Sequence, residues 1–244
     1  MIASWQRNFA LCHKAWMESR AIFAACVFIT FVNSWLALDR TYEAVLAKRI
    51  DNTVAPFALL DGTYRVWGIL FSLLGAGCLL WERRQGGLTF SLSLPVRLVH
   101  FNLIRAAVGF AQVAFVGSIP NLVAGWIHQW LRPELQVPII PAFTIAGIAL
   151  GLASFGLAYL VGSFLRNIYV AIGTGWLAAV AFSFLMAQLS FTDSLAGMTV
   201  LRNLGSLPPK PIVWYPVCAY SIIATVFVVV GAYIAERRSQ LDDR

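Results

Sequence analysis

Long apolar stretches alternate with short polar connections along the whole chain. Each stretch matches the roughly 17–25 residues that an α-helix needs to cross the hydrocarbon core of a bilayer, about 30 Å thick. The stretches with this length and hydropathy lie at about 21–38, 64–81, 106–127, 142–165, 168–191 and 213–235. The pattern therefore predicts an all-α polytopic membrane protein with six transmembrane helices.

The segment before the first stretch has a different pattern. Its apolar residues recur at helical spacing, at Ile2, Trp5, Phe9, Cys12 and Trp16. Polar and basic residues occupy the other faces of the same helix. A helix of this kind, with tryptophan anchors, is suited to the headgroup layer of a membrane. We therefore expect an amphipathic interfacial helix over residues 1–20.

The connections are too short to hold a second folded domain. We predict one transmembrane domain over 1–244, in which the interfacial helix is followed by a six-span bundle at 21–235 and a cytoplasmic tail at 236–244.

The composition excludes a soluble monomer. Hydrophobic residues make up 59% of the chain and charged residues only 12%, with a mean hydropathy of +0.75. A soluble domain carries about 25% charged residues, which it needs to cover its surface. The chain is therefore expected to reside in a lipid bilayer.

The distribution of basic residues predicts the orientation. With six spans both termini lie on one side, and eleven of the 18 lysines and arginines fall on that side. The positive-inside rule then places both termini in the cytoplasm, in a multi-pass protein of the cell (inner or plasma) membrane. The net charge of +7 follows from this bias and does not indicate nucleic-acid binding.

Several kinds of chemistry lack their residues in this sequence. The predicted spans contain no acid, lysine or histidine in their interior, which argues against an ion-coupled carrier. His13, His100 and His128 have no metal-ligand spacing, and we expect them to be polar residues at the membrane interface. The motifs of zinc proteases, serine hydrolases and phosphate-binding loops are absent. We thus expect no catalytic residue, no metal site and no bound cofactor, and any ATPase would be carried by another polypeptide.

The fourth and fifth predicted spans carry small residues at helical spacing. Only Arg166 and Asn167 separate these spans, so they form an antiparallel hairpin. The small residues are Gly147, Gly151, Ser154, Ala158 and Gly162 in the first, and Ala171, Gly175, Ala179, Ser183 and Ala187 in the second. Small residues let helix backbones approach closely in lipid. We expect them to pack within one subunit, with a homodimer seam as the alternative.

The connection between the second and third spans has an unusual order of elements. A charged cluster (Glu82, Arg83, Arg84) is followed by two glycines (Gly86, Gly87) and an apolar run that includes Leu88, Phe90, Leu92 and Leu94; Pro95 and Arg97 then close the segment. The run is long enough for about two helical turns. It is too short to cross a bilayer. An apolar helix on the cytoplasmic face of the membrane needs lipid headgroups or a protein groove to cover it.

This order resembles the permease subunits of the type-2 ABC exporter family. In that family the second span ends in a Glu, a Gly follows, and a leucine-rich run closes with Leu-Pro and a basic residue. Here Glu82, Gly86 or Gly87, Leu94-Pro95 and Arg97 match this order, and Arg105 matches a later basic residue at the start of the third span. The six spans, the amphipathic N-terminal helix and the cytoplasmic termini match as well.

The resemblance implies a coupling helix at about 86–96, which would seat in a groove of a separate nucleotide-binding ATPase subunit. Glu82 would fix this segment through charge-assisted hydrogen bonds. Arg83, Arg84 and Arg97 would make similar contacts, or anchor to lipid phosphates instead. ATP and Mg²⁺ would bind to the partner subunit and not to this chain.

The resemblance also implies a dimer of permeases, either two copies of this chain or this chain with a related one. The cargo would cross along their interface, lined mainly by the second and fifth spans. The candidate pathway residues are Trp67, Phe71, Trp176, Phe184 and Gln188. The alternative for the four aromatic residues is ordinary packing within the protein or contact with lipid. A different class of function, a membrane scaffold or assembly factor without transport activity, shares the hydropathy. A membrane-embedded enzyme lacks its catalytic groups.

Overall fold

The chain is all-helical wherever the structure describes it. The computed structural model describes residues 2–47, 55–84, 97–131, 140–165, 167–188 and 214–242. Six α-helices occupy these ranges: α1 (Ile2–Leu46), α2 (Ala55–Arg84), α4 (Leu98–Leu131), α5 (Ile140–Phe164), α6 (Ile168–Gln188) and α8 (Trp214–Asp242). No strand is present within them, so the predicted all-α class is confirmed for this part of the chain.

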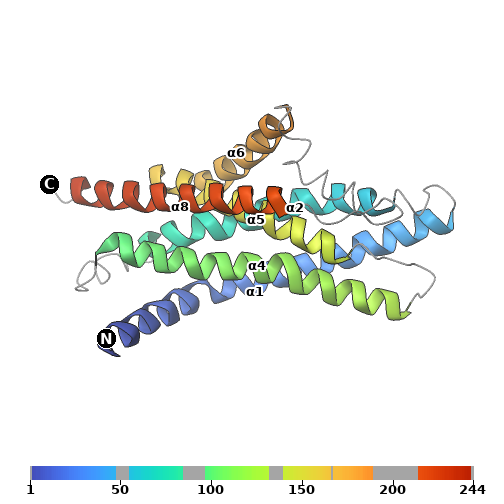
Figure 1. The fold of residues 1–244 in the computed structure, drawn as a ribbon, viewed down its shortest axis with the longest axis horizontal. Coiled ribbons are helices and arrows are strands. Elements are labelled where there is room, and N and C mark those ends of the chain that lie inside the picture. Colours follow the sequence, from blue (N-terminus) through green and yellow to red (C-terminus); the bar gives the residue numbers. More distant parts are fainter. Residues whose placement is uncertain are drawn as a thin grey trace.

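Consecutive helices run in opposite directions along the long axis of the molecule (Figure 1). Helices α1, α4 and α6 run away from the end that holds the N-terminus, and α2, α5 and α8 return to it. The C-terminus, the last residue of α2 and the first residue of α4 therefore lie at the same end as the N-terminus. We call this the terminal end of the bundle.

Within the described ranges, three helices are long and apolar enough to cross a membrane. The qualifying segments are Asn8–Arg40, Leu98–Leu131 and Cys218–Arg238. Shorter apolar segments lie in α2, α5 and α6, at Val66–Leu80, Gly151–Phe164 and Ile168–Ala181. The membrane character predicted from the composition is thus supported by the length of these helices.

The first helix differs from the expectation of a separate interfacial helix over 1–20. Instead, α1 continues without a break from Ile2 to Leu46. No glycine or proline occurs in this range, so nothing in the sequence interrupts the backbone hydrogen bonds. A helix of 45 residues is about 67 Å long, more than the whole thickness of a bilayer. The N-terminal residues therefore extend the axis of the first span.

Helices α1 and α4 are parallel and keep one register. Glu18 contacts Arg105, and Ser34 contacts Asn121; both pairs are separated by 87 residues in the sequence. An equal offset at two points about four turns apart means that the helices stay in step along their shared face.

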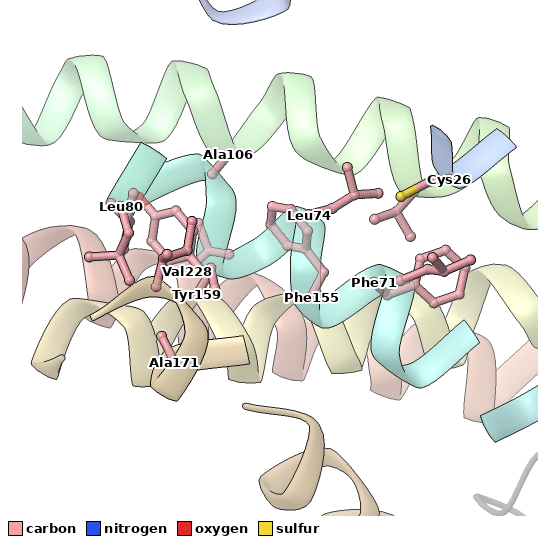
Figure 2. Close-up of a cluster of buried hydrophobic side chains, with 14 of the residues drawn as sticks. Cys26, Phe71, Leu74, Leu80, Ala106, Phe155, Tyr159, Ala171 and Val228 are labelled. Carbon is pink, nitrogen blue, oxygen red and sulfur yellow. The ribbon is translucent and has the colours of Figure 1, made fainter. Parts of the chain in front are cut away.

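Helix α5 lies at the centre and packs against α2, α4, α6 and α8. The main core cluster includes Phe71 and Leu74 of α2, Phe155 and Tyr159 of α5, and Val228 of α8, as Figure 2 shows. These side chains come from three helices and are at most 4% exposed. The core therefore fixes α2, α5 and α8 against each other.

The small residues of α5 and α6 lie at close helix contacts. A Cβ added to Gly175 would be 2.8 Å from the Cβ of Ala158, and one added to Gly151 would be 2.8 Å from the Phe71 ring. Ala171 is fully buried. Packing within one subunit is confirmed at these positions, whereas the side chains of Ser183 and Ala187 and the surroundings of Gly147 lie outside the described residues.

Candidate functional site

An ion pair joins α1 to α4 near the terminal end. Arg105 donates from Nη2 to Oε2 of Glu18. The side chain of Arg105 is 6% exposed and that of Glu18 is 21% exposed. A charge-assisted hydrogen bond removed from water in this way is among the stronger polar contacts available to a protein. It therefore holds the two helices at a defined point.

An aromatic ring and a second cation complete the surroundings of this pair. The guanidinium of Arg105 lies 4.9 Å from the centre of the Phe101 ring, one turn earlier on α4. The ammonium of Lys14 lies 5.1 Å from the same ring and 3.7 Å from Oε1 of Glu18. Rings attract cations through their negative faces. Phe101 thus positions both cations around one carboxylate.

A second polar contact lies beside the ion pair. Gln112 of α4 donates from Nε2 to Oγ of Ser19, at 2.6 Å. Its carbonyl oxygen Oε1 is buried and has no hydrogen-bond partner among the described residues. These groups face a cavity of about 20 Å³, lined also by Glu18, Cys78 and Arg105. A volume of about 10–15 Å³ with polar partners is enough for one water molecule, so the cavity has room for a water that would satisfy Gln112.

The backbone of α4 is held from two further sides at the same level. The thiol of Cys78, on α2, donates to the carbonyl of Arg105 at 3.9 Å. The hydroxyl of Tyr159, on α5, donates to the carbonyl of Asn102 at 3.2 Å. The first turns of α4 are therefore bonded to α1, α2 and α5. We call the set Glu18, Ser19, Cys78, Asn102, Arg105, Gln112 and Tyr159 the polar junction.

Farther from the terminal end, the α1–α4 contact contains a second polar pair. Ser34 donates to Oδ1 of Asn121 at 2.5 Å, and Asn121 donates to the carbonyl of Gly117 at 2.8 Å. Both side chains are buried. Paired polar groups of this kind join helices in lipid, where an unpaired polar group is costly.

His128, expected as a polar residue at the membrane interface, is covered by aromatic side chains of α1. This residue is 1% exposed and lies between the rings of Trp35 and Tyr42 of α1, with ring centres 5.9 and 6.0 Å away. The parallel register places the end of α4 against aromatic residues of α1, which cover it. By contrast, His100 is exposed and is hydrogen-bonded to Asn8 at 3.1 Å, and His13 is exposed. Among the described residues, no three histidine, cysteine or acidic side chains are grouped as metal ligands.

The predicted coupling residues lie at the terminal end where the structure reaches them. Glu82, Arg83 and Arg84 form the last residues of α2, although their side chains are outside the described set. Arg97 is exposed and directly precedes α4. The remaining predicted residues, Gly86, Gly87, Leu88, Phe90, Leu92, Leu94 and Pro95, lie outside the described residues.

The predicted pathway residues do not share one environment. Trp67 and Phe71 are each 1% exposed and belong to the hydrophobic core, with ring centres 6.2 Å apart. Trp176 is half-buried beside α2, where a Cβ on Gly68 would lie 3.1 Å from its ring. Phe184 and Gln188 belong to the final turns of α6, and their side chains are not among those described. The position of Trp67 and Phe71 corresponds to the packing alternative.

The polar junction was missed as a site because its members are far apart in the sequence. In the sequence, Arg105 stands out only as a basic residue at the start of a span, and Glu18 is one of the polar residues on the other faces of the predicted interfacial helix. One signal was available: Glu18 is the only acid in the first 20 residues. Each residue of the ion pair also lies just before a predicted span, so a hydropathy window that starts at 21 or 106 omits both.

The comparisons with known proteins give no family for this chain: no family model, no curated protein and no solved structure matches it.

Proposed function

We propose that this chain is the membrane subunit of an ATP-driven exporter of the type-2 ABC class, coupled to a separate ATPase through residues 86–96. The observation that carries the proposal is the position of the two described helix ends that this segment connects. Its flanking residues, Arg84 and Leu98, lie at the same end of the bundle as both termini. An apolar run of this length between two such helix ends is too short to cross a membrane, so we assign it to the groove of a partner.

The spacing of residues along α1 and α4 supports two of the six proposed spans. On α1, Glu18 and Asp39 are separated by 21 residues, which is about 32 Å along a helix. The same spacing on α4 separates Arg105 from Trp126, whose side chain is 71% exposed. Both lengths equal the hydrocarbon thickness of about 30 Å. We propose that the membrane lies between these levels and that all six helices cross it.

The charge distribution supports a cytoplasmic terminal end. Arg20, Arg97 and Arg237 are exposed there. Basic residues accumulate on the cytoplasmic side of membrane proteins. We therefore propose that both termini and the coupling segment face the cytoplasm of a cell (inner or plasma) membrane, where an ATPase has access to ATP.

The proposed mechanism is mechanical. ATP and Mg²⁺ bind to the partner ATPase, closure of two ATPase subunits moves two coupling segments, and a dimer of permeases changes between inward-open and outward-open forms. ATP shifts this equilibrium only because the two forms bind the ATPase with different affinity. The predominantly apolar helices suit a hydrophobic or amphipathic cargo. In this scheme Trp67, Phe71, Trp176, Phe184 and Gln188 remain predicted pathway residues.

Identification of the partner tests this proposal. The chain is purified from its native membrane in mild detergent, and the co-purifying proteins are identified by mass spectrometry. We expect an ATPase without membrane spans in stoichiometric amount, together with a second permease chain or a second copy of this one. Purification of the chain with no ATPase, under conditions that keep other membrane complexes intact, contradicts the proposal.

The second candidate function is a membrane scaffold or assembly factor. The buried polar pairs between α1 and α4 also suit a rigid structural protein, since polar contacts of this kind stabilise helix association whatever the activity. Such a protein has no use for an apolar segment between Gly87 and Pro95. Replacement of that segment by a Gly/Ser linker separates the two: a scaffold keeps its partners, whereas an exporter loses its ATPase.

A further inference from the structure

We infer that Glu18 and Arg105 are the positioning residues that pass a movement of the 85–96 connection to α1. The inference rests on the proposed function, and it concerns how force moves inside this chain after the ATPase has acted. Neither residue belongs to the segment that would meet the ATPase.

The first step is the place of Arg105 on α4. The helix begins at Leu98, directly after the proposed coupling segment and Arg97. Arg105 therefore lies two turns from the point where a push would enter. A helix transmits displacement along its axis with little compression because each turn is bonded to the next. A displacement of Leu98 therefore reaches Arg105 through one continuous helix.

The second step is what Arg105 holds. Its guanidinium binds the carboxylate of Glu18 on α1 and rests on the Phe101 ring, while Gln112 binds Ser19 of α1 at 2.6 Å. The α1–α4 pair keeps one register as far as Ser34 and Asn121. A push on α4 is therefore shared by α1 along their common length.

The third step is the difference between this link and the contacts of α2 and α5. Cys78 and Tyr159 reach α4 through neutral bonds to backbone carbonyls, at 3.9 and 3.2 Å. Thiol and hydroxyl donors make weaker contacts than a charge-assisted pair. The polar link of α4 to α1 is thus stronger than its polar links to α2 and α5. Helix α4 also packs more extensively against α1 than against α5 or α2, so that α1 and α4 form one moving unit.

The test measures whether α1 and α4 move together. Spin labels are placed at exposed positions near the terminal end: Ala21 on α1, Ala107 on α4 and Tyr233 on α8. The exposed native thiols Cys12 and Cys218 are first replaced by serine. Distances between label pairs are measured by pulsed electron resonance in the complete complex with its ATPase, in nanodiscs, with and without ATP and vanadate.

In the unmodified chain we expect ATP to change the Ala21–Tyr233 and Ala107–Tyr233 distances while the Ala21–Ala107 distance stays constant. In E18Q, the Ala107–Tyr233 change persists, the Ala21–Tyr233 change is lost, and the Ala21–Ala107 distance becomes ATP-dependent. The exchanged pair E18R/R105E restores the unmodified pattern. Arg20→Gln is the matched control, since Arg20 is exposed and bonds to the sulfur of Met17 in its own helix. We expect this variant to leave all three distances as in the unmodified chain.

Two results overturn the inference in distinguishable ways. If all distances respond to ATP identically in the unmodified chain and in E18Q, the ion pair does not transmit movement, while the proposed function stands. If no label pair responds to ATP in the unmodified complex, the exporter proposal fails and this inference fails with it. The exchanged pair keeps the number of charges, so a folding defect of the single variant does not prevent a decision.

Discussion

The carboxylate of Glu18 on α1 accepts a hydrogen bond from the guanidinium of Arg105 on α4, and this pair has the same sequence offset of 87 residues as Ser34 and Asn121. Together these contacts fix the register of α1 along α4 and the rotation of each helix about its own axis. Because both pairs are largely buried, removal of one partner lowers the stability of the protein more than it would in an exposed pair.

Removal of the Glu18 charge is expected to destabilise the protein. E18Q leaves the guanidinium of Arg105, 6% exposed, without its anion. Loss of one partner of such a contact costs about 1–3 kcal/mol. The measurement is the thermal unfolding midpoint in detergent, with Arg20→Gln as the control that stays within about 0.5 kcal/mol. Equal midpoints for E18Q and the control would show that the pair does not contribute to stability.

The second polar pair is expected to contribute less. Ser34→Ala removes the donor to Asn121, and polar contacts between membrane helices are worth about 0.6 kcal/mol on average, with a maximum near 1.7 kcal/mol. The control is Ser118→Ala, whose hydroxyl bonds to the carbonyl of Ala114 in its own helix at 2.6 Å. Unfolding in a denaturing detergent should separate the two variants. A larger loss for Ser118→Ala than for Ser34→Ala contradicts the assigned register.

Two glycines of α6 give a matched test of the small-residue contacts. Gly175→Ala would put a methyl group 2.8 Å from the Cβ of Ala158, whereas no atom lies within 4 Å of a methyl on Gly173. Overpacking costs about 1–3 kcal/mol. In the open position, alanine gains helix propensity of up to about 1 kcal/mol. We therefore expect Gly175→Ala to lower the unfolding midpoint and Gly173→Ala to leave it unchanged or raise it. The reverse order would mean that α6 faces α5 with its other side.

The end of α5 depends on a cation from α8. Arg238 donates to the carbonyl of Ser163 at 3.3 Å and to that of Phe164, the last residues of the helix. Cations at this position stabilise a helix by about 0.3–1 kcal/mol. Arg238→Gln should lose this stabilisation of the end of α5. The exposed neighbour Arg237 provides the control substitution, Arg237→Gln. Amide exchange near Phe164, measured by mass spectrometry, should rise in the first variant and not in the second.

The sequence predicted where the helices lie but not how far they extend. The predicted span at 168–191 corresponds to α6, Ile168–Gln188, and that at 142–165 to α5, Ile140–Phe164. The first span, 21–38, corresponds to a helix from Ile2 to Leu46. Hydropathy reports the part of a helix inside the hydrocarbon core, whereas backbone hydrogen bonding continues into polar residues until a breaker stops it.

Contacts between distant residues could not be predicted in the same way. The four-residue spacing of Gly175 and Ala171 shows a packing face in one sequence window, so the close contact of α5 and α6 was expected. The Glu18–Arg105 pair and the burial of His128 arise from the register of α1 against α4. The residue pattern within one helix does not determine how that helix is aligned along another.

The central claim is that the apolar segment between the second and third helices couples this chain to an ATPase. Its most direct measurement is the ATP hydrolysis rate of the co-purified ATPase, reconstituted with the unmodified chain or with the L88S/L92S variant. Ser91→Ala and Ser93→Ala, in the same segment, serve as controls. We predict that the unmodified chain and both controls stimulate hydrolysis and that L88S/L92S loses the stimulation while still inserting in the membrane. Stimulation by L88S/L92S equal to that of the unmodified chain would contradict the account.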